Sequence, residues 1–240
     1  MIDFHSHILP GIDDGPESID ESLEMAAMLA RAGFTTIYCT PHLMKGCFDA
    51  DNQTVLSAVI NLQKKLNEEN IKIEVLPGRE YYLDEFLGQH LKHPLPLGKT
   101  KYIMVEIPNS ADERFVKQTC FRIKCSGFIP MIAHPERCGH FAVYFNHQKN
   151  SKAFLGFSFK KNKTADSKTK GSSLINYLRE IGCGFQGNMG SFQGMYGPDV
   201  QKTANFLKGK NLFTHYGTDA HSIHALMHLN LKVHNLNLNA

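Results

Sequence analysis

Apolar and polar positions along this chain follow two alternating spacings. Short runs of β-branched and aromatic residues predict strands, and apolar residues three and four positions apart predict helices between them. After an opening strand that carries His5 and His7, the expected strands are residues 35–40, 71–76, 102–107, 128–133, 183–188 and 211–216. The expected helices are about 18–32, 51–69, 84–90, 112–125, 174–181 and 198–208, followed by a tail helix from 223 that frays before 240.

This repeat of strand and helix predicts an α/β fold with parallel strands. About seven strands alternate with helices, and no Pro-, Gly- or Ser-rich linker separates two zones of composition. We therefore expect one domain over residues 1–240 rather than two small ones. The simplest architecture is a barrel, in which functional residues gather at the C-terminal ends of the strands.

One lysine-rich stretch interrupts the repeat. Residues 149–171 hold seven lysines and a single acid, Asp166, with Ser, Thr and Asn between them. A solvated loop or insertion at about 147–173 fits this composition better than a packed element does. Attraction of phosphate or of a membrane surface is the less favoured interpretation.

Composition narrows the class of protein. The net charge of +3 is too small to indicate nucleic acid, and no apolar run approaches the roughly 20 residues that cross a bilayer. The N-terminus carries no basic leader with an apolar core, so no export signal is visible. The six cysteines form no Cys-x-x-Cys pair and are typical of reduced thiols in a cytoplasmic protein. Thirteen histidines in 240 residues is a high count, and it points to chemistry.

Two histidines on the opening strand are the first candidates. His5 and His7 are two residues apart, so their rings point to the same face of a strand, and paired imidazoles commonly bind transition metals. Asp13 and Asp14 follow in a turn rich in Pro and Gly that can return toward the strand end. A buried strand that happens to hold two histidines is the alternative, and this motif alone supports both about equally.

The ends of the later strands add further ligands. With the first turn they place five imidazoles and four carboxylates at one rim: His5, His7, Asp14, His42, Glu80, Glu106, His134, Asp219 and His221. Because one ion needs fewer ligands, the set predicts two or three clustered metal ions with a bridging carboxylate such as Glu80. Arg137 lies next to His134 and carries a guanidinium suited to phosphate. Clustered dications beside an arginine favour hydrolysis of a phosphate ester.

The motifs that carry these residues resemble a known family. They are DFHSHILPGIDDG at 3–15, TPH at 40–42, PGRE at 77–80, VEIP at 105–108, HPER at 134–137 and GTDAH at 217–221. In this order they resemble the PHP (polymerase and histidinol phosphatase) superfamily. Within it they are similar to the bacterial protein-tyrosine phosphatases of capsule and exopolysaccharide operons, the CpsB/YwqE type. The resemblance implies a distorted (β/α)7 barrel with its active site at the C-terminal strand ends.

The resemblance also implies a site with three divalent metal ions. Manganese is the usual metal, although iron, cobalt and zinc suit the same ligands. Carried over by position, the implied ligand sets are His5, His7, Glu80 and Asp219 for one ion, Glu80, Glu106 and His134 for a second, and Asp14, His42 and His221 for a third. Arg137 would hold the substrate phosphate. The implied substrate is phosphotyrosine on a partner tyrosine kinase that controls polysaccharide chain length.

The chain departs from the family pattern after its last motif. Such enzymes usually carry a further arginine there, whereas no arginine follows Arg179 in this sequence. His224 or His228 is a candidate substitute, although surface histidines of a tail helix are the favoured interpretation. The lysine-rich stretch after HPER is a second departure, and both bear on substrate affinity rather than on the metal ligands.

Three functional hypotheses follow. The main one is a manganese-dependent protein-tyrosine phosphatase in which His42 or His221 acts as a general acid if its metal site is partly empty. A histidinol-phosphatase-like enzyme for small molecules is the second. The third is a non-catalytic metal-binding module that docks onto a kinase.

Overall fold

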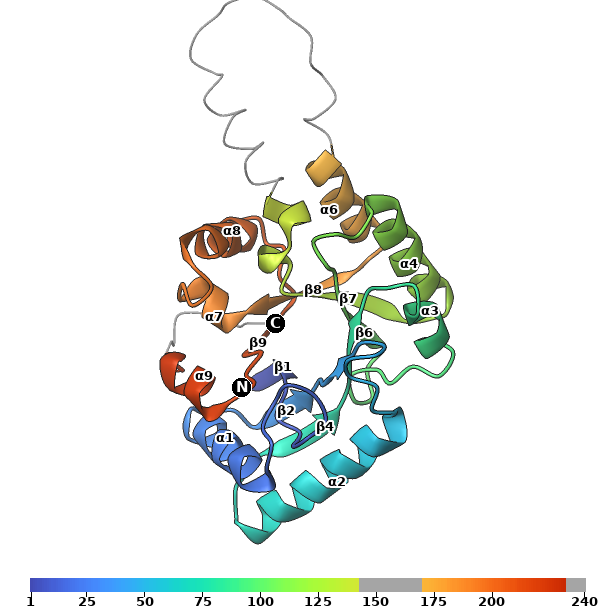
Figure 1. Cartoon of the computed structure of the whole chain (residues 1–240). Coiled ribbons are helices and arrows are strands. Elements are labelled where there is room, and N and C mark those ends of the chain that lie inside the picture. The colour runs from blue at the N-terminus through green and yellow to red at the C-terminus, as the bar shows by residue number, and fades with distance from the viewer. Residues whose placement is uncertain (143–169, 232–240) are drawn as a thin grey trace, which may run out of the picture.

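The strands of the protein all run parallel and lie at the centre of a ring of helices (Figure 1). The computed structural model describes residues 1–142 and 170–231. One sheet has the order β1 (Ile2–Ser6), β2 (Thr36–Cys39) and β4 (Glu74–Pro77). The other has the order β3 (His42–Leu43), β5 (Glu80–Tyr82), β6 (Tyr102–Glu106), β7 (Ile129–Ala133), β8 (Gly184–Asn188) and β9 (His215–Gly217).

The short strands β3 and β5 continue β2 and β4 after a break of two residues. Thr36 to Cys39 pair with Glu74 to Pro77, and His42 to Leu43 then pair with Glu80 to Tyr81 in the second sheet. The sequence predicts strand ends at residues 40 and 76, with His42 and Glu80 in the loops beyond. That prediction was wrong, because Pro41 cannot donate to a ladder and the sequence therefore looks like an ending. Both residues lie on strands instead.

The ring of strands closes between β9 and β1. Ser6 forms an isolated parallel bridge with Ala220, and the Asp219 backbone N–H donates to His5 O at 2.7 Å. Asp3, which is fully buried, accepts hydrogen bonds from Thr218 N at 2.9 Å and Thr218 Oγ1 at 2.6 Å. The fold is thus the expected distorted (β/α)7 barrel, with β2–β3 and β4–β5 each counting as one broken strand.

The helices pack outside the strands. They are α1 (Ile19–Arg31), α2 (Asn52–Glu68), α3 (Leu87–His90), α4 (Glu113–Cys125), α6 (Lys170–Glu180), α7 (Met189–Phe192), α8 (Pro198–Gly209) and α9 (Ile223–His228). Ser18, Asp51 and Asp112 cap α1, α2 and α4 through side-chain oxygens that accept backbone N–H groups. Among the described residues, none of these helices has the length and apolar character needed to cross a membrane.

Several predicted boundaries shift in the structure. α6 begins at Lys170, so the end of the predicted lysine-rich loop at 147–173 is helical, while residues 143–169 lie outside the described part. β9 begins at His215 rather than 211, because Leu212 N–H bonds back to Leu207 O at the end of α8. α9 ends at His228, and the predicted continuation over residues 232–240 also lies outside the described part. Local hydrogen bonding that closes helix ends explains the shift of β9.

Three apolar clusters support the barrel. Two of them fill the space between the strands and the surrounding helices. The third contains strand residues and the connecting residue Leu97, with no helix residue: Phe4, Tyr38, Leu76, Leu97, Tyr102, Met104, Met131 and Ala133. Its membership places this cluster inside the barrel, where it forms an apolar interior next to the polar strand ends.

Candidate metal centre

The polar strand ends enclose a cavity of about 310 Å³. Its lining is Asp14, His42, Glu80, Glu106, His134, Arg137, Tyr196, Asp219 and His221. His5 and His7 are fully buried and reach it through Glu80, whose Oε2 lies 3.1 Å from His5 Nε2 and 3.2 Å from His7 Nε2. All nine ligands named from the sequence, together with Arg137, therefore meet at one place. Tyr196 is the lining residue that the sequence did not single out.

The deepest group of candidate ligands is buried. His5, His7, Glu80 and Asp219 each offer one atom to a set in which all atoms lie within 4.8 Å of one another. His5 Nε2 is 3.0 Å from His7 Nε2 and 3.2 Å from Asp219 Oδ1. These are the distances expected of ligand atoms that face a common centre, since each ligand atom of a first-row metal lies about 2.0–2.2 Å from the ion.

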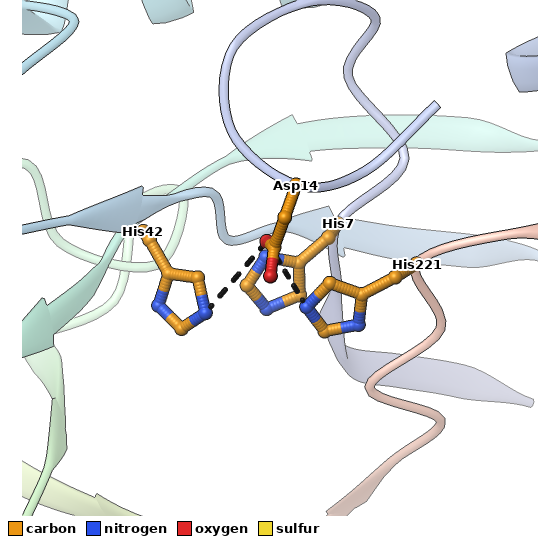
Figure 2. A group of neighbouring side chains, drawn as sticks. All are labelled: His7, Asp14, His42 and His221. Atoms are coloured by element: carbon orange, nitrogen blue, oxygen red, sulfur yellow. Dashed lines mark ion pairs between the residues drawn. The ribbon is translucent and has the colours of Figure 1, made fainter. Parts of the chain in front are cut away.

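A second group lies nearer the surface. Figure 2 shows His7, Asp14, His42 and His221, with the carboxylate of Asp14 between the last two rings. Asp14 Oδ1 is 3.4 Å from His221 Nε2 and 3.9 Å from His42 Nε2, and the rings of His7 and His221 stack at 3.8 Å. The Asp14 side chain is 53% exposed, so this group is open to solvent and to small ligands.

Glu80 connects these groups to a third. His42, Glu80 and Glu106 also form a set within 4.8 Å, and Glu80 Oε1 lies 2.9 Å from His134 Nε2. His42 Nδ1 is buried and has no hydrogen-bond partner among the described residues, although Glu80 Oε2 is 3.2 Å away. An orphaned imidazole nitrogen beside carboxylates fits a metal site, because a ligating nitrogen needs a lone pair rather than a donor.

The charges of the cluster are strongly coupled. Burial alone would lower the pKa of His5, but Glu80 and Asp219 raise it to about 9. Burial opposes ionisation of Glu80, yet His5, His134 and His7 hold its pKa well below the ordinary value. Burial and the negative charge of Glu80 raise the pKa of Glu106. Anionic oxygens and imidazoles in such a set suit divalent cations, which would displace the imidazole protons.

Three residues that the sequence did not single out, together with Asp13 of the first turn, support the candidate ligands. Asp13 Oδ2 lies 2.6 Å from His7 Nδ1, and Gln186 Oε1 lies 2.9 Å from His5 Nδ1. Asn188 Nδ2 donates to Asp219 Oδ2 at 2.9 Å, and Asp3 ties the start of β1 to Thr218. Such partners fix the orientation of ligating groups. A signal for two of them exists, because the polar residues at 186 and 188 alternate at the end of an otherwise apolar strand.

Arg137 is held in a closed circuit of contacts. Its Nη1 lies 2.6 Å from Asp219 Oδ2, and its guanidinium lies over the Tyr196 ring at 4.5 Å from the centroid. Asn188 completes the circuit, because its Nδ2 group reaches both the Tyr196 hydroxyl at 3.2 Å and Asp219. The flat cation is therefore fixed in its plane at the cavity wall.

Two residues of the site, His134 and Asp219, have a constrained backbone with positive φ. His134 has a φ of 28° and is followed by a turn of 3-10 helix, η1 (Pro135–Arg137). Asp219 has a φ of 52°. Side chains other than glycine rarely occupy this left-handed region, and such residues cluster at functional sites. Neither feature was predictable from the spacing of apolar residues.

Fold and site together define a class. A parallel (β/α)7 barrel that gathers nine metal-competent side chains and an arginine at its strand ends has the architecture of the PHP-type phosphatases. Residues 1–162 match the family model for capsular polysaccharide synthesis, CpsB/CapC. The chain belongs to this CpsB/CapC family.

Sequence similarity to named tyrosine-protein phosphatases supports the assignment to this family. The chain is 33% identical over 225 residues to the tyrosine-protein phosphatase YwqE of Bacillus subtilis, covering 93% of this chain and 78% of the relative. It is 32% identical over 139 residues to the tyrosine-protein phosphatase CpsB of Streptococcus pneumoniae, covering 57% of each chain. The expected family is confirmed.

Solved structures agree. A chain from the crystal structures of Bacillus subtilis YwqE and Streptococcus pneumoniae CpsB, described as unique metal-dependent tyrosine phosphatases, superimposes with a TM-score of 0.75 at 32% identity. The match covers 94% of this chain and 81% of that one. A Listeria monocytogenes protein described as the putative histidinol phosphatase HisK superimposes with a TM-score of 0.53 at 12% identity, which shows the fold alone.

Proposed function

We propose that this protein is a metal-dependent phosphoric monoester hydrolase that removes phosphate from protein phosphotyrosine. The observation that carries the proposal is the convergence of nine metal-competent side chains and Arg137 on one cavity. The family membership and the names of the relatives agree with it. A single domain over residues 1–240 would carry the site, because its ligands come from both ends of the strand order.

We assign three divalent ions to the cavity, with manganese as the first choice. The ligand sets are those implied by the family: His5, His7, Glu80 and Asp219, then Glu80, Glu106 and His134, then Asp14, His42 and His221. Three groups of side chains have ligand atoms within 4.8 Å of one another, and they can be compared with these sets. One group has the same members as the first set, and another consists of the third set with His7 added. The remaining group places His42 beside Glu80 and Glu106. When bound, such ions lower the pKa of water and neutralise phosphoryl oxygens.

The side chains of the cavity have separate tasks in this proposal. Arg137 binds the phosphoryl oxygens with a guanidinium that Tyr196 and Asp219 already hold in place. His42 and His221 line the cavity, and where their metal site is partly empty one of them is our candidate for donating a proton to the leaving oxygen. A phenol has a pKa of about 10, so its oxygen leaves with less help than an alkoxide needs.

The physiological setting follows from the family. We propose a phosphorylated tyrosine kinase of capsular or exopolysaccharide biosynthesis as the partner, in line with the family description. A cytoplasmic location is consistent with the six cysteines, all of which are free. A small-molecule phosphatase of the histidinol phosphatase type shares the fold and is the second candidate.

The test compares two substrates on one protein. Manganese-loaded protein should hydrolyse a phosphotyrosine peptide faster than histidinol phosphate, and removal of the metal by a chelator should abolish turnover. Arg137→Ala should lower kcat/KM by about 100-fold or more, the effect of losing a fixed donor to a developing charge. Arg122→Ala on the exposed face of α4 is the matched control and should leave kcat/KM unchanged.

Three results would contradict the proposal. Full activity after the metal has been stripped would show that the reaction does not depend on a metal ion. A preference for histidinol phosphate would select the small-molecule alternative. Absence of turnover in the parent protein, combined with retained binding of a kinase by Arg137→Ala, would select the non-catalytic module.

A further inference from the structure

A second cavity adjoins the metal cavity and has a different lining. It has a volume of about 410 Å³ and shares Glu106, His134 and Arg137 with the metal cavity. Its other lining residues are Tyr82, Ile107, Pro108, Asn109, Ser110 and Cys138, and we call the space that they enclose the side pocket. Because Arg137 lines both spaces, a phosphate held by Arg137 would lie at their junction.

The chemistry of the side pocket selects against a second anion. Its charged groups are the shared ones, and none of the six residues that belong to it alone carries a charge. In the described part of the chain, a diphosphate or a nucleotide would find no guanidinium or ammonium group in this lining besides Arg137. Ring, aliphatic and thiol surfaces lie beside the amide of Asn109 and the hydroxyl of Ser110. This combination suits polypeptide, which presents apolar side chains together with backbone hydrogen-bonding groups.

The wall of the side pocket is pre-organised. Asn109 Oδ1 accepts a hydrogen bond from Gly139 N at 2.6 Å, which ties the segment after β6 to the segment after η1. Ala111 N donates to Pro108 O at 3.0 Å, and His140 Nε2 lies 3.0 Å from Ala111 O. Binding against a wall that is already fixed saves the entropy of ordering it.

The metal cavity has room for only part of a phosphopeptide. At about 310 Å³ it lies at the lower end of small-molecule sites, and the phosphate together with the proposed metal ions would occupy much of it. Among the described residues, Tyr196 is its one aromatic lining residue apart from the imidazoles. It is 38% exposed, so it offers a surface for the phenyl ring of the substrate. The peptide chain must then continue outside this cavity.

We propose that the side pocket binds the polypeptide that flanks the phosphotyrosine. The inference rests on the proposed function and deepens it, because it makes the protein selective for phosphotyrosine within a chain over small aryl phosphates. Ser110 is exposed, forms no side-chain hydrogen bond in the described part of the chain, and does not line the metal cavity. It is therefore the position at which the pocket is best blocked.

The experiment fills the side pocket and compares two substrates. Ser110→Trp should raise the KM for a nine-residue phosphotyrosine peptide at least about tenfold, the effect of losing roughly 1.4 kcal/mol of binding. The kcat/KM for p-nitrophenyl phosphate, which has no flanking chain, should stay within about twofold. Ser57→Trp on the exposed side of α2 is the matched control and should leave both substrates unchanged.

A charged variant tests the same contact without bulk. Ser110→Glu should raise the KM several-fold for a peptide with acidic flanks relative to one with lysine flanks, since two charges about 4 Å apart in water interact by about 1 kcal/mol. An equal response to both peptides, or an equal loss on p-nitrophenyl phosphate and peptide, would overturn the inference alone. A parent protein that hydrolyses neither substrate would overturn the proposed function and the inference with it.

Discussion

Replacement of Asp13 by asparagine tests how a buried carboxylate prepares a metal ligand. Asp13 Oδ2 lies 2.6 Å from His7 Nδ1 and accepts the His42 backbone N–H at 2.9 Å. Burial opposes the ionisation of Asp13, but the hydrogen bond and charge of His7 keep its pKa below the ordinary value. The carboxylate can only accept, so a neutral His7 carries its proton on Nδ1 and keeps a lone pair on Nε2 for a metal.

An asparagine has the same shape but brings an NH₂ group. Oδ2 faces His7 and His42, and Oδ1 accepts the Gly15 backbone N–H at 3.1 Å, so donors lie on both sides of the carboxylate. Either orientation of the amide leaves at least one donor unpaired. We expect a loss of about 1–3 kcal/mol in the free energy of unfolding without metal. The metal affinity should fall by about 10–100-fold, as for other partners of ligating histidines.

The assay combines urea unfolding of metal-free protein with calorimetric titration of manganese. Asp14→Asn is the matched comparison, because Asp14 is the next residue but its side chain is 53% exposed. Asp14→Asn should leave the unfolding free energy within about 0.5 kcal/mol and weaken the binding of one ion. If Asp13→Asn matches the parent in both stability and metal affinity, the reasoning is refuted.

Two further predictions concern Tyr196 and His215. Tyr196→Leu removes the ring over Arg137, so it should raise the KM for aryl phosphate and weaken the affinity for inorganic phosphate, each about 3–30-fold. Tyr196→Phe keeps the ring and should retain KM and phosphate affinity close to those of the parent. Equal behaviour of the two variants would contradict a positioning role for the ring. Burial between Phe4 and Tyr102 lowers the pKa of His215 to about 4. The unfolded chain therefore binds more protons between pH 4 and 6.5, and stability falls as the pH is lowered through this window. Urea unfolding at pH 6.5 and 4.5 should show that His215→Phe loses about 1–2 kcal/mol less than the parent, after allowance for the partial exposure of His215, and an equal loss would contradict this cause.

Elements that depend on local interactions were predictable from the sequence. The caps at Ser18, Asp51 and Asp112 lie within three residues of the N–H groups that they accept, so the starts of α1, α2 and α4 follow from short stretches of chain. The apolar stripe of α2, with Val55, Val59 and Leu62 buried, has the same local origin.

Elements that depend on partners distant in sequence were not predictable from the sequence. β3 and β5 exist because His42 and Glu80 pair with each other across 38 residues of sequence, and each follows a proline, Pro41 or Pro77, that looks like the end of the preceding strand. α7 begins where Asn188, at the end of β8, accepts the Gly190 N–H and bonds Asp219 from β9's loop. A pattern of apolar residues contains no information on such pairings.

The sequence by itself determined which residue types stand at the strand ends, and so the family and the kind of chemistry. Tertiary structure alone decided what each side chain contacts. Asp13 and Asp14 are chemically identical neighbours, yet the turn buries one against His7 and leaves the other 53% exposed between His42 and His221. The reason is physical: the role of a carboxylate depends on its burial and on the donors around it, and here those donors come from residues up to 207 positions away along the chain.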